Sequence, residues 1–381
     1  MPKPRVIHVY KDYYPPVVGG IEKTINLMAE GLQDEFDVRV LVANRRVRTE
    51  EEARRGVHVM KVASLGRVAS APLAPRFAAL MREWRSDIWH FHCPHPTGEL
   101  AWLWARPEGR AVVSYHSDIV RQRWALWAYG PFLRRFLRQV DVVMPTSPDY
   151  RDTSPWLRPI RERCRIVPLG VALERFEPTP ELKRRAQAVR ERLGGGPVVL
   201  FVGRFRYYKG LQFLLPAMTK VPAARLALVG DGPMRPRLES LARSLGIAGR
   251  IHWAGEVCDA ELPAWYYAAD VFCLPSHLRS EAFGIAQIEA MACGVPVVSC
   301  RLNSGVPFVN RDGQTGRVVE PGDWRALAAG LNELLGDGEL RRRLGEGARR
   351  RAWSEFSAAV MCDRVRAVYR SVLDKDDRKP S

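Results

Sequence analysis

Two successive series of short apolar segments, each alternating with amphipathic stretches, constrain the fold of this chain more than any other feature. Many of the segments are nearly continuous in Val, Ile and Leu, as expected of strands buried on both faces of a parallel sheet. Such alternation predicts right-handed βαβ units in doubly wound sheets. The first series comprises residues 5–10, 38–43, 57–63, 87–92, 110–116, 141–147 and 165–170. The second comprises residues 198–203, 225–230, 250–255, 270–275, 295–300 and 316–320.

The two series are separated by a Pro-containing connector, a basic helix and the breaker GGGP within residues 171–197. A chain of 381 residues exceeds what a single hydrophobic core usually supports. The sequence therefore predicts an α/β protein with two Rossmann-like domains, at residues 1–175 and 176–353. Residues 354–381 form a helix that could pack back on the first domain, followed by a polar tail.

The formal net charge of +17 is distributed over both halves of the chain, which argues against a basic nucleic-acid-binding tail. The seven cysteines form no C-x-x-C pair, so neither a disulfide framework nor a cysteine-rich zinc site is expected. No apolar run approaches the roughly 20 residues that a membrane-spanning helix needs, and no signal-peptide core precedes the first strand. We expect a cytoplasmic protein, with the inner face of the membrane as a place where it could bind peripherally.

The segment SEAFGIAQIEAMACGVPVVSC, residues 280–300, carries the richest set of candidate site residues. Glu281 follows a strand, at the edge of the sheet where open α/β proteins bind ligands. Phe283, Gly284 and Ile285 open a helix, whose free N–H groups and positive dipole end suit a phosphate. Glu289 follows about two turns later, so the two carboxylates could bind hydroxyl pairs. The alternative is that Glu281 only caps the helix and Glu289 is a surface residue.

The motif GRFRYYKG directly follows the strand VVLFVG and provides Arg204 and Lys209. A guanidinium and an ammonium group on one turn suit a diphosphate. The alternative is a solvated basic loop.

Two candidates lie in the first half of the chain. Gly19 and Gly20, in PPVVGGIE, form a phosphate-compatible loop before a helix, although this signal is weak alone. His116, in YHSD, stands at the carboxyl end of a strand, where it is either a site residue or a structural histidine.

Two further motifs resemble sites without satisfying their patterns. GDGPMR has Arg235 where the dinucleotide-binding fingerprint needs its third glycine, which disfavours NAD. In WHFHCPHP, His90 and His92 share a strand face, but neither a carboxylate nor a second spaced pair follows. We therefore expect no metal site.

Together the motifs resemble glycosyltransferase family 4, a retaining family of the GT-B fold, over nearly the whole chain. The paired-glutamate segment with its downstream GVPVV is the specific part, whereas the glycine loops are common to many proteins. YHSDIVRQ, TSPDY and SGVPFVNRDGQTGRVVEPGD are further similar to bacterial mannosyltransferases of O-antigen and exopolysaccharide assembly. The resemblance implies two Rossmann-like domains that face a central cleft.

For the second domain, the resemblance implies a nucleotide-sugar site. Arg204 and Lys209 would neutralise the donor diphosphate, and Glu281 would bind hydroxyls of the donor sugar. The amides of 283–285 would bind sugar and phosphate oxygens, and Glu289 would bind the ribose diol. Ala282 replaces the serine of many relatives, a change that does not touch these ligands.

For the first domain, the resemblance places Gly20, with Gly19, against the donor phosphates and His116 near the donor sugar, at its 6-hydroxyl. It implies a metal-independent hexosyltransferase that retains the anomeric configuration and needs no cofactor besides the sugar nucleotide. No protein nucleophile is evident in the motifs.

The expected reaction transfers a sugar, mannose first, from GDP-mannose to a lipid-linked or oligosaccharide acceptor in lipopolysaccharide or other surface-polysaccharide synthesis. The alternative is another GT-B activity with a UDP-sugar, such as a glucose or N-acetylglucosamine transferase or an epimerase. A Rossmann oxidoreductase is disfavoured by the missing glycine, and a non-catalytic nucleotide binder by the presence of all the presumed ligands.

Residues 119–140, IVRQRWALWAYGPFLRRFLRQV, combine basic and aromatic side chains without an acidic residue. This composition is typical of helices that lie in the headgroup region of a membrane. The alternative is that the aromatic face packs on the first sheet. The residues concerned are Arg121, Arg123, Arg134, Arg135, Arg138, Trp124, Trp127, Tyr129, Phe132 and Phe136.

Overall fold

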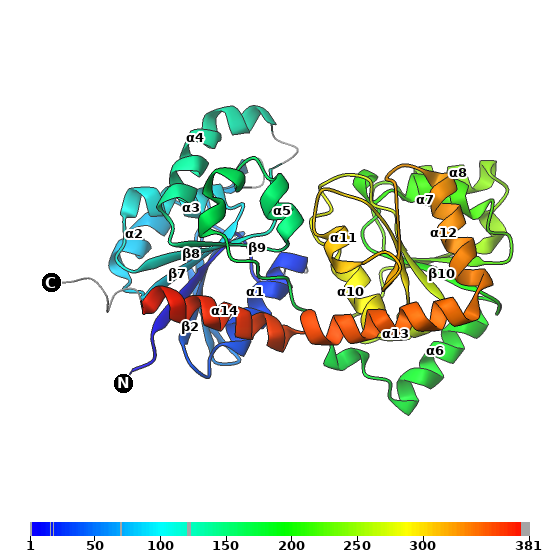
Figure 1. Ribbon diagram of the computed structural model, residues 1–381. Helices are drawn as coiled ribbons and strands as arrows, with labels where there is room; N and C mark the ends of the chain where they lie inside the picture. Colours follow the sequence, from blue (N-terminus) through cyan, green and yellow to red (C-terminus); the bar gives the residue numbers. More distant parts are fainter. Residues whose placement is uncertain (1, 16, 18, 69–70, 120–122, 375–381) are drawn as a thin grey trace. The chain divides into compact units, whose positions relative to one another are not determined.

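The computed structural model describes residues 2–15, 17, 19–68, 71–119 and 123–374, except the side chains of 123–126. The chain divides into two compact units (Figure 1). Unit 1 comprises Met1–Gly170 and Ala358–Ser381, and unit 2 comprises Val171–Ser357. The domain boundaries predicted from the sequence, at residues 175 and 353, lie a few residues from the unit boundaries at 170 and 357.

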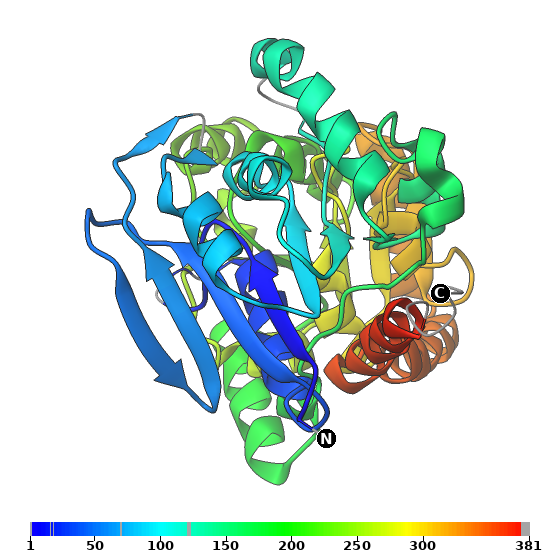
Figure 2. The same ribbon diagram turned by 90° about the vertical axis from the view of Figure 1, so that its left-hand side faces the viewer.

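Unit 1 is built on a seven-stranded sheet of order β3-β4-β2-β1-β7-β8-β9. All neighbours pair in parallel except β3 and β4, which form an antiparallel hairpin at one edge, on the left of Figure 2. The sequence pattern did not predict β3, because the charged stretch EEEAR lacks the apolar run of a buried strand. The strands are β1 Arg5–Val9, β2 Asp37–Ala43, β3 Glu50–Arg54, β4 Val57–Val62, β7 Ile88–Cys93, β8 Arg110–Tyr115 and β9 Val142–Pro145, with a separate small hairpin of β5 Arg67–Val68 and β6 Ala71–Pro72.

Helices cover both faces of this sheet. On one face α2, α3 and α4 lie side by side, and on the other α1 packs against α14, so the C-terminal helix returns to unit 1. The core on the second face joins strand residues such as Val40 and Val112 to Met361 and Val365 of α14. The helices are α1 Gly20–Gly31, α2 Arg76–Glu83, α3 Pro96–Ala105, α4 Arg123–Gln139, α5 Pro148–Thr153 and α14 Ala358–Leu373.

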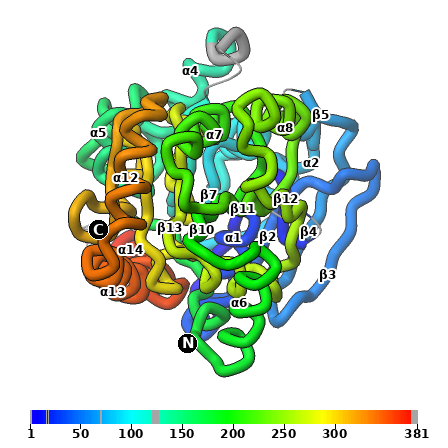
Figure 3. Tube along the Cα trace, turned by 90° about the vertical axis from the view of Figure 1, so that its right-hand side faces the viewer, coloured from blue at the N-terminus to red at the C-terminus, as the bar shows by residue number. Residues whose placement is uncertain are grey.

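Unit 2 has a six-stranded parallel sheet of order β12-β11-β10-β13-β14-β15. Helices α8, α7 and α12 form one layer, and α6, α9, α10 and α13 form the other (Figure 3). The strands are β10 Val198–Val202, β11 Arg225–Val229, β12 Ile251–Gly255, β13 Val271–Leu274, β14 Val297–Cys300 and β15 Gly316–Val319. The helices are α6 Pro180–Arg192, α7 Leu211–Met218, α8 Arg235–Ser244, α9 Leu262–Tyr267, α10 Ile285–Ala292, α11 Val306–Val309, α12 Trp324–Gly336 and α13 Gly338–Glu355.

Two predicted elements differ from the structure. Residues 165–170 are not a strand, although Arg165 and Val167 donate backbone hydrogen bonds to β9. Pro168 has no N–H with which to continue the ladder. The helix predicted from residue 354 is also wrong at its start, because α13 runs on to Glu355 and α14 begins only at Ala358.

Among the described residues, no helix is both long and apolar enough to cross a bilayer. All seven cysteines are free, and only Cys258 is exposed.

Candidate functional site

A lysine–glutamate ion pair lies at the carboxyl end of the second sheet. Lys209 closes the short 3-10 turn Tyr207–Lys209 after β10, and Glu281 lies in the loop after β13. Lys209 Nζ is 2.6 Å from Glu281 Oε2, and the two side chains are only 12% and 9% exposed. Gly210 next to the lysine has φ +76°, and a Cβ there would lie 1.9 Å from the Pro275 carbonyl oxygen. The loops after β10 and β13 can therefore meet this closely only with glycine at 210.

The surroundings of this pair are polar but shielded from solvent. Ser276 Oγ donates a 3.0 Å hydrogen bond to the same carboxylate oxygen of Glu281. Burial lowers the pKa of Lys209, but the neighbouring Glu281 carboxylate outweighs it and the net shift is upward. Lys209 is therefore a permanent cation that a ligand phosphate could share with Glu281.

The N-terminus of α10 lies beside Glu281 in the chain and is open to an anion. Gly284 caps the helix with φ +75°, and a Cβ there would lie 2.7 Å from Leu274 Cδ2, so this position also requires glycine. The backbone N–H groups of Phe283, Gly284 and Ile285 make no hydrogen bond to another described residue. Free N–H groups at the positive end of a helix are a binding site for phosphate or carboxylate oxygens.

Arg204 supplies a second cation on the turn after β10. Its side chain is exposed and makes no ion pair or hydrogen bond with the described residues. The alternative of a solvated basic loop fits this exposure. It does not fit Lys209, which is buried and paired with Glu281. Arg204 and Lys209 thus differ in role, one a free cation and one held in place.

Glu289 is buried on α10, so the alternative of a surface carboxylate is wrong. Its Oε1 lies 2.5 Å from an Arg175 guanidinium nitrogen, and its Oε2 accepts a 2.7 Å hydrogen bond from the Tyr266 hydroxyl. Burial, and then the Glu289 charge, raise the pKa of Tyr266 well above its usual value. Arg175 and Tyr266 could not be predicted from the sequence, because no motif marks a residue in the connector or one on α9.

In unit 1, the predicted glycine loop starts α1, with Gly19 as N-cap and Gly20 as first helical residue. The Glu22 side chain folds back over the start of this helix. A Cβ added to Gly19 would lie only 2.1 Å from Glu22 Oε2. Burial is the main reason that the pKa of Glu22 is raised. The structure thus adds a carboxylate to the predicted phosphate loop, and a phosphate bound there would have to displace it.

His116 directly follows β8 and is 3% exposed. Burial lowers its pKa to about 3, so the ring is neutral at physiological pH. The neighbouring Asp118 does not pair with it: Asp118 accepts hydrogen bonds from Tyr115 and Ser154, and so holds the loop after β8 in place.

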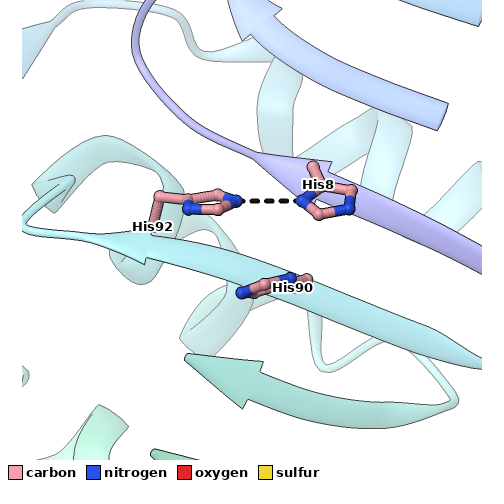
Figure 4. A group of neighbouring side chains, drawn as sticks. All are labelled: His8, His90 and His92. Carbon is pink, nitrogen blue, oxygen red and sulfur yellow. Dashed lines mark hydrogen bonds between the residues drawn. The ribbon is translucent and has the colours of Figure 1, made fainter. Parts of the chain in front are cut away.

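Three other histidines lie close together in unit 1, with ring nitrogens within 4.8 Å of one another: His8, His90 and His92 (Figure 4). The His90 ring stacks on that of His92, with centroids 4.4 Å apart and planes at 26°. Imidazole lone pairs lie in the ring plane, so stacked rings do not point at a shared ion. The in-plane nitrogens of His90 instead contact the hydroxyls of Tyr369 and Ser114.

The remaining motif, GDGPMR, follows β11 and opens α8. Arg235 pairs with Asp231 and Glu239 at 3.4 and 2.8 Å. The residue in the position of the third glycine is therefore an ion-paired arginine, where the fingerprint needs a glycine for close packing of helix and strand.

The second unit therefore combines three features within a doubly wound α/β architecture. These are the open N-terminus of α10, the cations of Arg204 and Lys209, and the carboxylates of Glu281 and Glu289, which are fixed by ion pairs and hydrogen bonds. Its fold matches solved glycosyltransferases of the GT-B class. Sucrose-phosphate synthase from Thermosynechococcus elongatus superposes with a TM-score of 0.81 at 23% identity, covering 98% of this chain and 100% of that one. Anabaena HepE in complex with UDP gives a TM-score of 0.74 at 20% identity, covering 96% and 100%. The protein thus has the GT-B fold.

Sequence similarity identifies the family. Residues 19–170 match the Glycosyl transferase 4-like domain, and residues 183–351 match Glycosyl transferases group 1. The chain belongs to glycosyltransferase family 4.

Relatives that match over nearly the full length of both chains include the following three. O-antigen chain mannosyltransferase C of Escherichia coli is 34% identical over 375 residues, which is 97% of this chain and 99% of that one. D-rhamnosyltransferase WbpZ of Pseudomonas aeruginosa is 34% identical, covering 93% and 92%. A GDP-mannose-dependent α-(1-6)-phosphatidylinositol monomannoside mannosyltransferase of Mycolicibacterium smegmatis is 31% identical, covering 90% and 91%.

Proposed function

We propose that this protein transfers mannose from GDP-mannose to a lipid-linked or oligosaccharide acceptor in surface-polysaccharide synthesis, with retention of the anomeric configuration. The observation that carries the proposal is the Lys209–Glu281 pair beside the open N-terminus of α10. It combines positive charge for a diphosphate with a carboxylate for sugar hydroxyls. The names of the E. coli and M. smegmatis relatives favour mannose, and the second favours GDP-mannose.

Each residue has a defined task in this proposal. Arg204 and Lys209 neutralise the diphosphate, as the charge on the leaving group grows in the transition state. The N–H groups of 283–285 donate to phosphate and sugar oxygens, and Glu281 accepts from sugar hydroxyls. Glu289 binds the ribose diol, for which it must exchange contacts with Arg175 or Tyr266.

In unit 1, Gly19 and Gly20 contribute the helix start for a phosphate, and His116 contacts a sugar hydroxyl. The acceptor hydroxyl attacks the anomeric carbon on the face that the diphosphate leaves. A phosphate oxygen of the donor then takes the acceptor proton. The residues above supply the positive charge for this step, so we propose no metal or other cofactor.

Binding of the donor is the direct test. We expect GDP-mannose at about 100 times its Kd to raise the unfolding temperature by about 3 °C or more, because a ligand that binds only the folded state stabilises it. GDP-glucose, UDP-glucose and UDP-N-acetylglucosamine are measured in parallel by thermal unfolding. A larger shift with a UDP-sugar would contradict the GDP-mannose proposal and favour the UDP-sugar alternative, and nicotinamide oxidation by the protein would favour an oxidoreductase.

We further propose that α4 rests on an anionic membrane surface. Trp127 is 88% exposed and Phe132 50% exposed, and the arginines of the helix's last two turns are exposed beside them. Phe136 is buried against Phe91 and Trp102, so the alternative that the aromatic residues pack on the sheet holds for this ring but not for the first two. Arg121 and the side chains of Arg123 and Trp124 lie outside the described residues.

Co-sedimentation with vesicles tests this surface. Replacing Arg134, Arg135 and Arg138 by Gln is expected to weaken binding to phosphatidylglycerol vesicles roughly 100-fold at low salt, since each basic residue contributes about 1 kcal/mol. The control replaces the three exposed basic residues 183–185 of α6 in the same way, which removes equal charge elsewhere. Equal weakening by both triple variants, or no preference for anionic over neutral vesicles, would reject the role of α4.

A further inference from the structure

Three histidines of unit 1 form a continuous hydrogen-bonded row across the sheet. His8 Nδ1 on β1 lies 2.9 Å from His92 Nε2 on β7. A dashed line marks this hydrogen bond in Figure 4. His92 Nδ1 in turn lies 3.0 Å from His116 Nε2, just beyond β8. The ring planes of the two pairs differ by only 17° and 13°. Since N–H bonds and lone pairs both lie in the ring plane, this arrangement allows two good hydrogen bonds in series.

The row has only two self-consistent proton arrangements. Each ring is buried, and burial depresses the pKa of all three, so each carries one N–H and one lone pair. In the first arrangement His8 donates to His92, which donates to His116, and the free proton of His116 is on Nδ1. In the second, both bonds reverse, Nδ1 of His116 is a bare acceptor, and the free proton lies on Nε2 of His8.

The two ends of the row decide between these arrangements. His8 Nε2 is fully buried and has no partner among the residues that the structure describes. A buried N–H without an acceptor is among the rarest and most costly features of folded proteins. His116 Nδ1 also has no described partner, but it lies at the carboxyl end of β8, the edge of the sheet where ligands of α/β proteins bind. In the unliganded protein a proton there would also lack an acceptor, so the first arrangement is favoured once a ligand oxygen accepts this proton.

We propose that His8 and His92 are positioning residues that hold His116 as its Nδ1–H tautomer, so that His116 donates a hydrogen bond to a hydroxyl oxygen of the bound sugar. The identity of the ligand rests on the proposed function, whereas the direction of the hydrogen bond rests on the row, because a sugar hydroxyl could also donate to a bare Nδ1. His116 is then a fixed donor and not a general base. Its role is to orient the sugar, and the proton of the acceptor goes elsewhere.

His90 provides a matched control within the same strand. It is as buried as His92 and stacks on it, but its nitrogens contact Tyr369 and Ser114 and take no part in the row. Its replacement removes a buried, hydrogen-bonded imidazole without breaking the contacts of His116.

The tautomer is measured directly by ¹⁵N NMR of the full chain with labelled histidine, with the His116 signals assigned by their loss in His116→Asn. With GDP-mannose bound at saturation, we expect wild type to show His116 protonated on Nδ1 and unprotonated on Nε2. A His116 protonated on Nε2 would overturn the proposal at once, before any variant is made.

The role of His92 is then tested with two variants. His92→Leu removes the donor to His116, so both tautomers of His116 are expected to appear and the KM for the sugar donor to rise about tenfold. His92→Asn places an amide N–H near the position of the imidazole Nδ1 and should restore the single tautomer and most of the affinity. His90→Leu should change neither the tautomer nor KM.

The outcomes separate the two proposals. An unchanged single Nδ1–H tautomer in His92→Leu would show that His92 does not position His116, and the inference would be wrong. A changed tautomer with unchanged KM would instead leave the row intact and reject the proposed contact between His116 and the sugar.

Discussion

Replacement of Glu281 by Ala is expected to reduce the rate of sugar transfer by roughly 10²–10³, which is the usual effect of losing one preorganised polar contact in an active site. Glu281 is held by Lys209 at 2.6 Å and by Ser276 at 3.0 Å, so its carboxylate is fixed before the ligand arrives. The variant also leaves the Lys209 ammonium buried without its partner. We therefore expect a loss of about 3 kcal/mol in the free energy of unfolding, with the fold retained.

Two further variants separate catalysis from folding. Glu281→Gln keeps the shape and the acceptor for Ser276 but not the charge, and it should lose activity with a smaller loss of stability. Glu320→Ala is the matched control, because Glu320 also follows a strand of this sheet but pairs with Arg301 in solvent, with both side chains at least 60% exposed. Transfer rates and thermal unfolding are measured for all three. Full activity in a folded Glu281→Ala protein would reject the role of this carboxylate.

Replacement of Arg204 by Ala is expected to weaken binding of the nucleoside diphosphate about 10–100-fold, the range for hydrogen bonds that involve a charged group. Because the Arg204 side chain is exposed and makes no hydrogen bond or ion pair with the described residues, its loss should change the free energy of unfolding by less than about 0.5 kcal/mol. Lys209→Met should weaken binding similarly but also destabilise the fold, since it leaves Glu281 unpaired in a shielded place.

Calorimetric titration with GDP distinguishes these effects. Arg301→Ala is the control for charge, because Arg301 follows β14 at the same edge of the sheet. Affinity equal to wild type in both Arg204→Ala and Lys209→Met would reject a phosphate role for this turn. Transfer by wild type should also survive treatment with a chelator, and strict dependence on a divalent ion would contradict the metal-independent mechanism.

The double variant Lys209→Met/Glu281→Ala should not show the sum of the single effects, because the two side chains contact each other. The motifs suggest that residues 209 and 281 bind the ligand independently, but in the structure their side chains form one ion pair. Sequence spacing could not predict this ion pair, because the pair depends on how closely the loops after β10 and β13 approach each other.

The two α/β units and the carboxyl-end position of Glu281, Lys209 and His116 could be predicted from the sequence. These follow from local patterns: apolar runs form the strands, and the loops after parallel strands collect at one edge of a sheet. The open N-terminus of α10 could also be predicted, because the glycine and the apolar helix that follows it are neighbours in the chain.

The partners of these residues, in contrast, depend on tertiary packing. Glu289 contacts Arg175, which lies in the connector, and Tyr266, which lies on α9. The histidine row requires β7 to lie between β1 and β8, with His8 opposite His90 and His92 opposite Ser114. Strand order and register are set by the packing of the whole unit and not by any one segment. This packing brings His8 and His92, 84 positions apart in sequence, and His92 and His116, 24 positions apart, within hydrogen-bond distance.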